Sequence, residues 1–241
     1  MMTRDVHLEA KGFLDSLKFK PGDFGSVALV SGQKHRAKLC LERIENPVKN
    51  FSFLGYNFWT GTYKGKKVTV GNGGYYAPDT AFITEMLCAG GVDRLIRLGS
   101  CGALRKDISV GDYILATDII RGDGVSRYYV DDDYVSEVDR FLSSRIEKVF
   151  SKGSRVHCGG VWTTDALFKE TKEIVNSYIN KGAISVDMVT SAFVTVSNVY
   201  KKKASAILAV SDNLITGEKG FSDARFFAAE SKMCELGFEL I

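Results

Sequence analysis

Short apolar runs rich in β-branched residues alternate along the chain with longer segments in which apolar residues recur at helical spacing. Such runs are typical of buried strands, and the longer periodic segments are typical of helices packed on one face. The predicted strands cover Ser26–Val30, Lys67–Gly71, Arg94–Leu98, Tyr113–Ile120, Val156–Trp162, Ala183–Val186 and Ala204–Val210. The predicted helices cover His35–Ile44, Thr80–Ala89, Val135–Phe150, Thr171–Lys181, Thr190–Tyr200 and Ser222–Leu236, the last with Ser222 as N-cap.

This alternation predicts an α/β fold with a mixed, mostly parallel central sheet flanked by helices. No repeat, linker or low-complexity tract interrupts it, so residues 1–241 are expected to form a single domain. Sheets of this kind place ligands at the carboxyl ends of their strands. Chemically suggestive residues follow the predicted strands at 32–36, 97–102, 187–188 and 211–212.

Charge and cysteine content narrow the function classes. The 32 basic and 29 acidic residues leave a formal charge of only +3, which does not favour nucleic acid as a partner. The five cysteines are widely spaced and odd in number, so neither a disulfide framework nor a metal site is expected, and a reducing cytoplasm fits best. The sequence shows no signal peptide and no apolar run of membrane-spanning length.

The segment Arg97–Leu104 is the most informative stretch. We expect the strand to end at Leu98 and run into a turn of small residues. A planar guanidinium from Arg97, the hydroxyl of Ser100 and the turn amides around Gly102 together suit an anion. An arginine in a structural ion pair beside an ordinary turn is the competing interpretation.

Several segments, in order, resemble the hexameric and trimeric nucleoside phosphorylases that act on purine nucleosides, methylthioadenosine or uridine. They are Lys20–Gly25, Val27–Lys38, Thr60–Val68, Ile96–Leu104, Arg121–Ser126, Val186–Met188 and Val210–Asn213. The resemblance implies attack of inorganic phosphate on C1′ of a nucleoside, which releases a free base and (deoxy)ribose 1-phosphate. It implies no cofactor besides the phosphate co-substrate. It also implies a homo-oligomer, from a dimer to a hexamer, with active sites between subunits.

The resemblance assigns the phosphate site to Gly32, Arg36, Arg97 and Ser100. Two arginines with backbone donors suit a phosphate oxyanion. The family's third arginine, supplied by an adjacent subunit, corresponds to Leu54 here. Lys49 lies close in sequence to that position.

For the sugar, the resemblance assigns Asp187 and Met188, and it relates His7 to an N-terminal histidine that is lent to a neighbour. The family's ribose-binding glutamate corresponds to Val189, which accepts no hydrogen bond. A hydrogen bond to a charged group is worth roughly 1.5–3 kcal/mol, so its loss would cost about 10–150-fold in rate. Asp187 capping the next helix, Met188 in the core and an exposed His7 are the alternative interpretations.

For the base, the resemblance makes Asp212 and Arg225 the catalytic residues of a purine-type site. A carboxylic acid in a dry pocket has a raised pKa and can protonate or hydrogen-bond purine N7. The remaining base-binding candidates are Cys101, Gly102, Leu167, Phe168 and Ser211. A turn cap at Asp212 and a solvated helix residue at Arg225 are the structural alternatives.

A purine-type nucleoside phosphorylase is therefore the leading hypothesis. A uridine phosphorylase is the alternative, because Lys20–Gly25 and Arg121–Ser126 resemble members of that type. A catalytically impaired nucleoside- or phosphate-binding homologue is a further hypothesis, because Leu54 and Val189 replace functional residues. A hydrolytic nucleosidase is disfavoured, since Arg36 and Arg97 would then have no phosphate to bind.

Overall fold

Ten strands form one mixed sheet in the computed structural model, which describes the backbone of residues 6–241 and side chains from residue 9 onward. The strands are β1 (Val27–Ser31), β2 (Glu45–Phe53), β3 (Tyr56–Tyr63), β4 (Lys66–Asn72), β5 (Arg94–Ala103), β6 (Tyr113–Gly122), β7 (Val156–Thr164), β8 (Ala183–Asp187), β9 (Lys203–Asn213) and β10 (Glu218–Lys219). The α-helices are α1 (Val6–Ser16), α2 (Lys34–Leu41), α3 (Ala77–Ala89), α4 (Arg140–Phe150), α5 (Lys172–Ile179), α6 (Thr190–Val199) and α7 (Ala224–Gly237). Short 3-10 helices are η1 (Ser126–Tyr128), η2 (Leu167–Lys169) and η3 (Phe238–Leu240).

The sheet order is β10-β9-β6-β7-β8-β5-β1-β4-β3-β2. Strands β4, β1, β5 and β9 run parallel to one another, as do β6, β7 and β8. Because β9 also pairs with β5, the strands β5, β9, β6, β7 and β8 close into a ring. The predicted α/β fold with a mixed sheet flanked by helices is confirmed.

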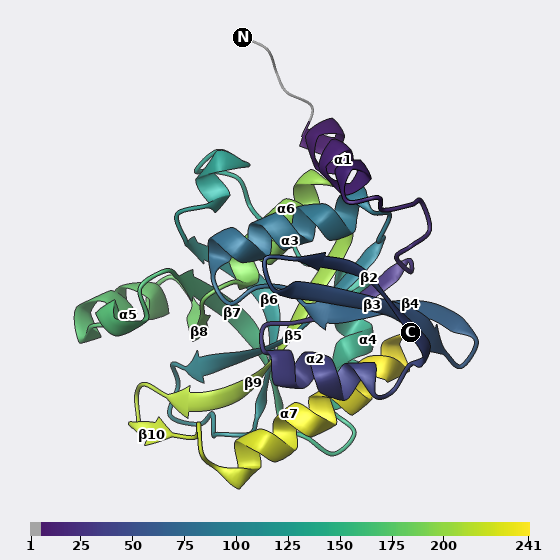
Figure 1. Ribbon diagram of the computed structural model, residues 1–241. Coiled ribbons are helices and arrows are strands. Elements are labelled where there is room, and N and C mark those ends of the chain that lie inside the picture. Colours follow the sequence, from purple (N-terminus) through teal and green to yellow (C-terminus); the bar gives the residue numbers. More distant parts are fainter. Residues whose placement is uncertain (1–5) are drawn as a thin grey trace.

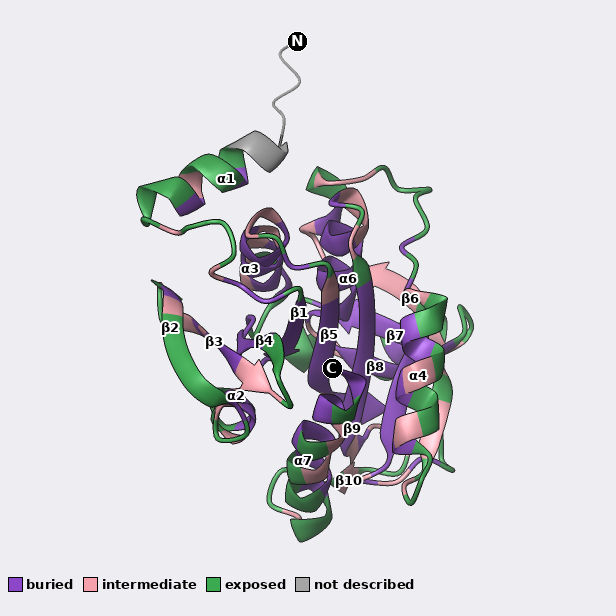
Figure 2. Cartoon of the chain, turned by 90° about the vertical axis from the view of Figure 1, so that its right-hand side faces the viewer, coloured by how far each residue is buried: buried purple, intermediate pink, exposed green. Residues whose placement is uncertain are grey.

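Helices cover both faces of the sheet (Figure 1). On one side α1, α3 and α6 bury residues such as Leu14, Ile83 and Phe193 in the largest core cluster. On the other side α2, α4 and α7 bury residues such as Ile146 and Met233 in a second cluster. Figure 2 shows that β5 and β9 are buried over most of their length, whereas β2 exposes one side to solvent.

Strand β5 corrects the prediction that Leu98 ends a strand before a small-residue turn. The strand continues to Ala103, paired with β9 throughout and with β8 at its end. Its glycines permit close packing instead of a turn. A Cβ on Gly99 would lie 2.3 Å from Leu208 Cδ2, and one on Gly102 would lie 2.6 Å from Leu214 Cδ1. The small residues therefore bring other side chains close to the strand backbone.

The other predicted strands and helices are present with shifted ends. Helix α4 begins at Arg140, after the N-cap Asp139, and not at Val135. Asp223, not Ser222, caps α7, since its carboxylate accepts the Arg225 N–H at 2.7 Å. The pattern missed α1 and the β2–β3 hairpin, whose first strand is largely exposed and lacks a continuous apolar run. None of the helices described between residues 6 and 241 is both long and apolar enough to cross a membrane.

Candidate active site

A cavity of about 400 Å³ lies where β5, β8 and β9 end. The strand register brings these ends together, because Gly102 pairs with Val186 on one side and with Asp212 on the other. This one cavity is lined by most of the residues to which the sequence analysis assigned a function. They are Arg36, Arg97, Ser100, Cys101, Gly102, Leu167, Phe168, Asp187, Met188, Ser211 and Asp212.

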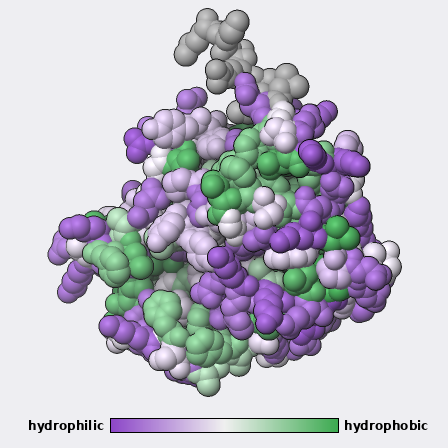
Figure 3. Space-filling view, viewed as in Figure 1, coloured by the Kyte–Doolittle hydropathy of each residue, from purple (hydrophilic) through white to green (hydrophobic). Residues whose placement is uncertain are grey.

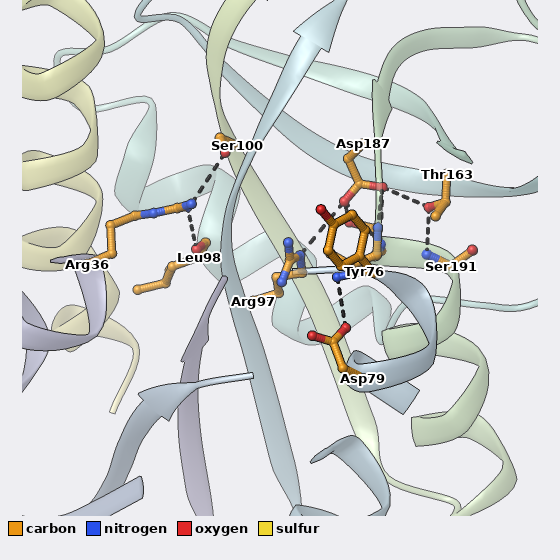
Figure 4. Close-up of polar contacts among 11 residues, drawn as sticks. Arg36, Tyr76, Asp79, Arg97, Leu98, Ser100, Thr163, Asp187 and Ser191 are labelled. Atoms are coloured by element: carbon orange, nitrogen blue, oxygen red, sulfur yellow. Dashed lines mark hydrogen bonds and ion pairs between the residues drawn. The ribbon is translucent and has the colours of Figure 1, made fainter. Parts of the chain in front are cut away.

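Arg36 enters the cavity from α2 and is almost fully buried. Its Nη1 donates to the Leu98 carbonyl at 2.7 Å, and its Nη2 donates to Ser100 Oγ at 3.3 Å (Figure 4). Its Nε lies 3.0 Å from Glu230 Oε1 of α7. Neither atom makes a hydrogen bond with any residue from 9 onward, so charge holds this pair. Burial lowers the pKa of Arg36 and raises that of Glu230, and the attraction within the pair opposes both shifts.

Arg97 is a second buried cation at the cavity. It is 4% exposed, and its Nε and Nη1 have no hydrogen-bond partner among the described residues. Its Nε lies 3.8 Å from Asp187 Oδ2, which is an ion pair without a hydrogen bond. Burial lowers the pKa of Arg97 to about 10, against the attraction of Asp187. A buried guanidinium with free N–H groups beside a cavity is suited to an oxyanion.

Gly32 is not among the residues lining the cavity, but it adjoins Arg97. A Cβ there would lie 3.6 Å from Arg97 Nη2 and 3.2 Å from the Gly74 carbonyl. A Cβ on Gly99 would lie 3.1 Å from Arg97 Nε. The absence of side chains at 32 and 99 therefore leaves room around the guanidinium.

Asp187, at the end of β8, is engaged with its own chain. Its carboxylate accepts from Thr163 Oγ1 at 2.7 Å, from Thr190 Oγ1 at 2.5 Å and from the backbone N–H groups of Val189 and Thr190. These contacts satisfy the first turn of α6, which has no other side-chain cap. Asp187 thus has a structural role at the cavity wall, with half-buried Met188 and buried Val189 beside it.

Asp212 occupies another part of the cavity. Ser211 Oγ donates to its Oδ1 at 2.7 Å, yet burial raises the pKa of Asp212. Leu167 and Phe168 of η2 and the nearby Phe221 also line this cavity, and each of the three is at least 47% exposed. Hydrophobic side chains gather on the corresponding face beside α5 and around β10 and the start of α7 (Figure 3).

Three residues named from the sequence lie elsewhere. Arg225 is held on the surface by Glu218 and Asp223, at 2.7 and 2.6 Å, and does not line the cavity. Leu54 is 78% exposed at the β2–β3 turn, and Lys49 is exposed on β2. The side chain of His7 falls outside the described residues.

Sequence reasoning missed two acidic residues. Glu230 was not predicted as a site residue, because a glutamate on an amphipathic helix normally faces solvent. Glu170 follows η2 in a polar stretch, yet it lines the same cavity as Asp212. Gln33, Tyr75, Val186, Leu214 and Phe221 complete the lining together with Val189. Apart from Val189, none of these residues was singled out from the sequence, although Gln33 and Val186 lie inside the segments that carry the family resemblance.

The chain thus has an α/β fold in which two arginines line a cavity at the ends of central strands. A family model described as the phosphorylase superfamily matches residues 26–236, and the chain belongs to that superfamily. It is similar to DeoD-type purine nucleoside phosphorylases of Bacillus cereus and Bacillus mycoides, at 32% and 31% identity. Each alignment spans 224 residues and covers 91% of this chain and 92% of the relative.

Solved structures agree on the fold. Uridine phosphorylase from Vibrio fischeri superimposes with a TM-score of 0.84 at 22% identity, covering 93% of this chain and 95% of that one.

Proposed function

We propose that this protein is a purine nucleoside phosphorylase that cleaves a nucleoside with inorganic phosphate into a free base and (deoxy)ribose 1-phosphate. The observation that carries the proposal is the buried guanidinium of Arg97 beside the cavity, whose Nε and Nη1 have no hydrogen-bond partner in the described part of the chain. Arg36 and Ser100 line the same cavity, so the oxyanion has several donors. The purine type is favoured by the relatives of about 30% identity and by Asp212.

In this mechanism the chain holds phosphate against Arg97, Arg36 and Ser100 and places the sugar over Met188. Leu167 and Phe168 contact the base, and Asp212 donates a hydrogen bond or a proton to it as negative charge develops. The raised pKa of Asp212 keeps more of that carboxyl protonated than an exposed aspartate would be. Phosphate is the nucleophile and the only co-substrate in the proposed reaction.

The test is phosphate-dependent release of base from adenosine, inosine and methylthioadenosine, with uridine and thymidine in the same panel. We expect purine release that stops when phosphate is omitted. Turnover of uridine alone would overturn the purine assignment, and release that is equal without phosphate would indicate hydrolysis.

A catalytically impaired nucleoside-binding protein is the second candidate. One observation favours it: Asp187 already accepts hydrogen bonds from Thr163, Val189 and Thr190, so it has little capacity left to replace the ribose-binding carboxylate lost at Val189. Calorimetric binding of a nucleoside without turnover of any panel member would support this candidate. Robust turnover would eliminate it.

We also infer a homo-oligomer in the cytoplasm. Phe168 and Phe221 at the cavity are 96% and 64% exposed, and a neighbouring subunit would bury such side chains. The five cysteines are free thiols, as a reducing compartment favours. Light scattering of the purified protein tests the assembly, and a monomeric mass would refute it.

A further inference from the structure

Two cysteines lie where α2 packs against α7, the helices that carry Arg36 and Glu230 (Figure 1). Cys40 follows Arg36 by about one turn of α2, and Cys234 follows Glu230 by about one turn of α7. The ion pair between Arg36 and Glu230 therefore brings the two cysteines into register, one turn farther along both helices. Both cysteine side chains are buried, at 1% and 0% exposure.

Contacts on either side of the two cysteines support this register. Cys234 Sγ donates to the Arg36 carbonyl at 3.6 Å. In an α-helix that carbonyl also accepts the N–H of the residue four positions later, which is Cys40. Farther along, Arg43 pairs with Glu235 of α7 at 3.5 Å. The two helices are thus held in a register that keeps the thiols adjacent.

The two thiols also interact directly, and their surroundings make them chemically unequal. The side-chain hydrogen bond with Cys40, and then the charge of Arg36, hold the pKa of the Cys234 thiol below its ordinary value, against the effect of burial. The same hydrogen bond, followed by burial, raises the pKa of Cys40. A more acidic thiol beside a second thiol suits capture of an oxidised sulfur as a disulfide.

We propose that Cys40 and Cys234 form a reversible disulfide on exposure to hydrogen peroxide, and that this bond weakens phosphate binding through Arg36. The Cys234 sulfur attacks one peroxide oxygen, so that an S–O bond forms, the O–O bond breaks and the leaving hydroxide takes up the thiol proton as water. The Cys40 sulfur then attacks the Cys234 sulfur, an S–S bond forms, and the S–O bond breaks with loss of a second water. Two thiols are oxidised and one peroxide is reduced to two waters.

Local opening of α2 gives peroxide access to the buried sulfurs. The helix has only eight residues, and its N-cap Gln33 makes no capping hydrogen bond through its side chain within the described part of the chain. Lys34, His35 and Lys38 are exposed, so α2 lies at the surface. A helix this short depends on its packing for stability, and such elements open without global unfolding.

The disulfide acts on Arg36 through the position of α2. An S–S bond is about 2.0 Å long, shorter than any contact between unbonded sulfurs, so oxidation draws α2 and α7 together here. Cys234 also loses the proton that it donates to the Arg36 carbonyl. The Arg36 guanidinium holds the Leu98 carbonyl and Ser100 Oγ at 2.7 and 3.3 Å, and both contacts depend on where α2 lies. This consequence rests on the proposed function, whereas formation of the disulfide does not.

The experiment treats the whole protein with hydrogen peroxide, blocks the remaining thiols, digests it with trypsin without reductant and measures peptide masses. Trypsin releases Cys40 in peptide 39–43 and Cys234 in peptide 233–241, so the disulfide joins two short, identifiable peptides. Calorimetry measures phosphate affinity before oxidation, after oxidation and after treatment with dithiothreitol. We expect the linked peptide together with phosphate binding that is about tenfold weaker, both reversed by dithiothreitol.

Two variants separate this pair from the other thiols. Cys40→Ala should lose both the linked peptide and the effect of peroxide on phosphate affinity. Cys88→Ala removes another buried thiol, on α3, and should respond to peroxide as the wild type does. Equal loss of phosphate affinity in oxidised Cys40→Ala and oxidised wild type would overturn the proposal.

Absence of the linked peptide from protein whose exposed Cys158 has been oxidised would also overturn it, because the reagent has then been shown to act. A linked peptide with unchanged phosphate affinity would refute the effect on Arg36. Absence of phosphate binding by the reduced wild type would instead overturn the proposed function, and the peptide masses would still decide whether the disulfide forms. The peptide measurement needs only the wild type, so it remains decisive if Cys40→Ala does not fold.

Discussion

Neutralising Glu230 tests the most unusual feature of the proposed phosphate site, an arginine that already faces an internal carboxylate. The Arg36–Glu230 pair spans 3.0 Å, and its side chains are 2% and 1% exposed. Removing one partner of such a buried pair costs about 3–5 kcal/mol, because the other charge stays buried without compensation. For a chain of this size, each kcal/mol lowers the melting temperature by about 2–4 °C, so Glu230→Gln should melt roughly 6–20 °C below the wild type.

Phosphate should then restore more stability to Glu230→Gln than to the wild type. In the variant, Arg36 has no opposing carboxylate, and a bound oxyanion supplies the missing negative charge. Calorimetric melting curves with increasing phosphate measure this difference. Glu235→Gln is the control on the same helix, since its pair with Arg43 is exposed and 3.5 Å long, and its loss should cost only about 0–1 kcal/mol. A loss below about 3 °C for Glu230→Gln, or equal phosphate stabilisation of both proteins, would refute this account of the site.

Four other predictions follow from the same cavity. Arg97→Met should lower kcat/KM by about 10²–10³-fold, because the oxyanion loses a stabilising cation. The control Arg105→Met, at an exposed ion pair with Asp107, should leave kcat/KM unchanged, and equal effects of the two variants would contradict phosphate binding by Arg97. Val189→Glu should raise phosphorolysis by supplying a ribose acceptor, and no gain in kcat/KM would mean that the sugar is held differently. Gly102→Ala should raise the KM for nucleoside, because the new Cβ would lie 2.6 Å from Leu214 Cδ1 and 3.1 Å from Asp212 Oδ2. An unchanged KM would show that the base binds elsewhere. Activity on adenosine should fall as pH rises through about 7, where the Glu170 carboxyl in the cavity loses its proton and its charge opposes the negative charge that develops on the base. A pH profile that stays the same in Glu170→Gln would contradict this effect of Glu170.

The alternation of elements was readable from the sequence because it depends on local periodicity. Apolar β-branched runs predicted the central strands, and helical spacing predicted the helices that cover them. The β2–β3 hairpin was not predicted, because its exposed first strand has no continuous apolar run. The end of β5 was misplaced, since small residues suggest a turn locally and permit close strand packing in the sheet.

The candidate site, too, was predictable from the sequence only in part. Arg36, Arg97 and Asp212 were visible in ordered motifs, and the fold places all three in one cavity. The sequence by itself thus determined the family, the succession of strands and helices, and most residues of the cavity wall. Only the tertiary structure decided which charges face one another: Glu230 faces Arg36 and Asp187 faces Arg97, whereas Arg225 lies outside the cavity. Those pairings join segments that are far apart in the chain. The energies of their charges depend on burial and on strand register, and no local sequence pattern encodes either.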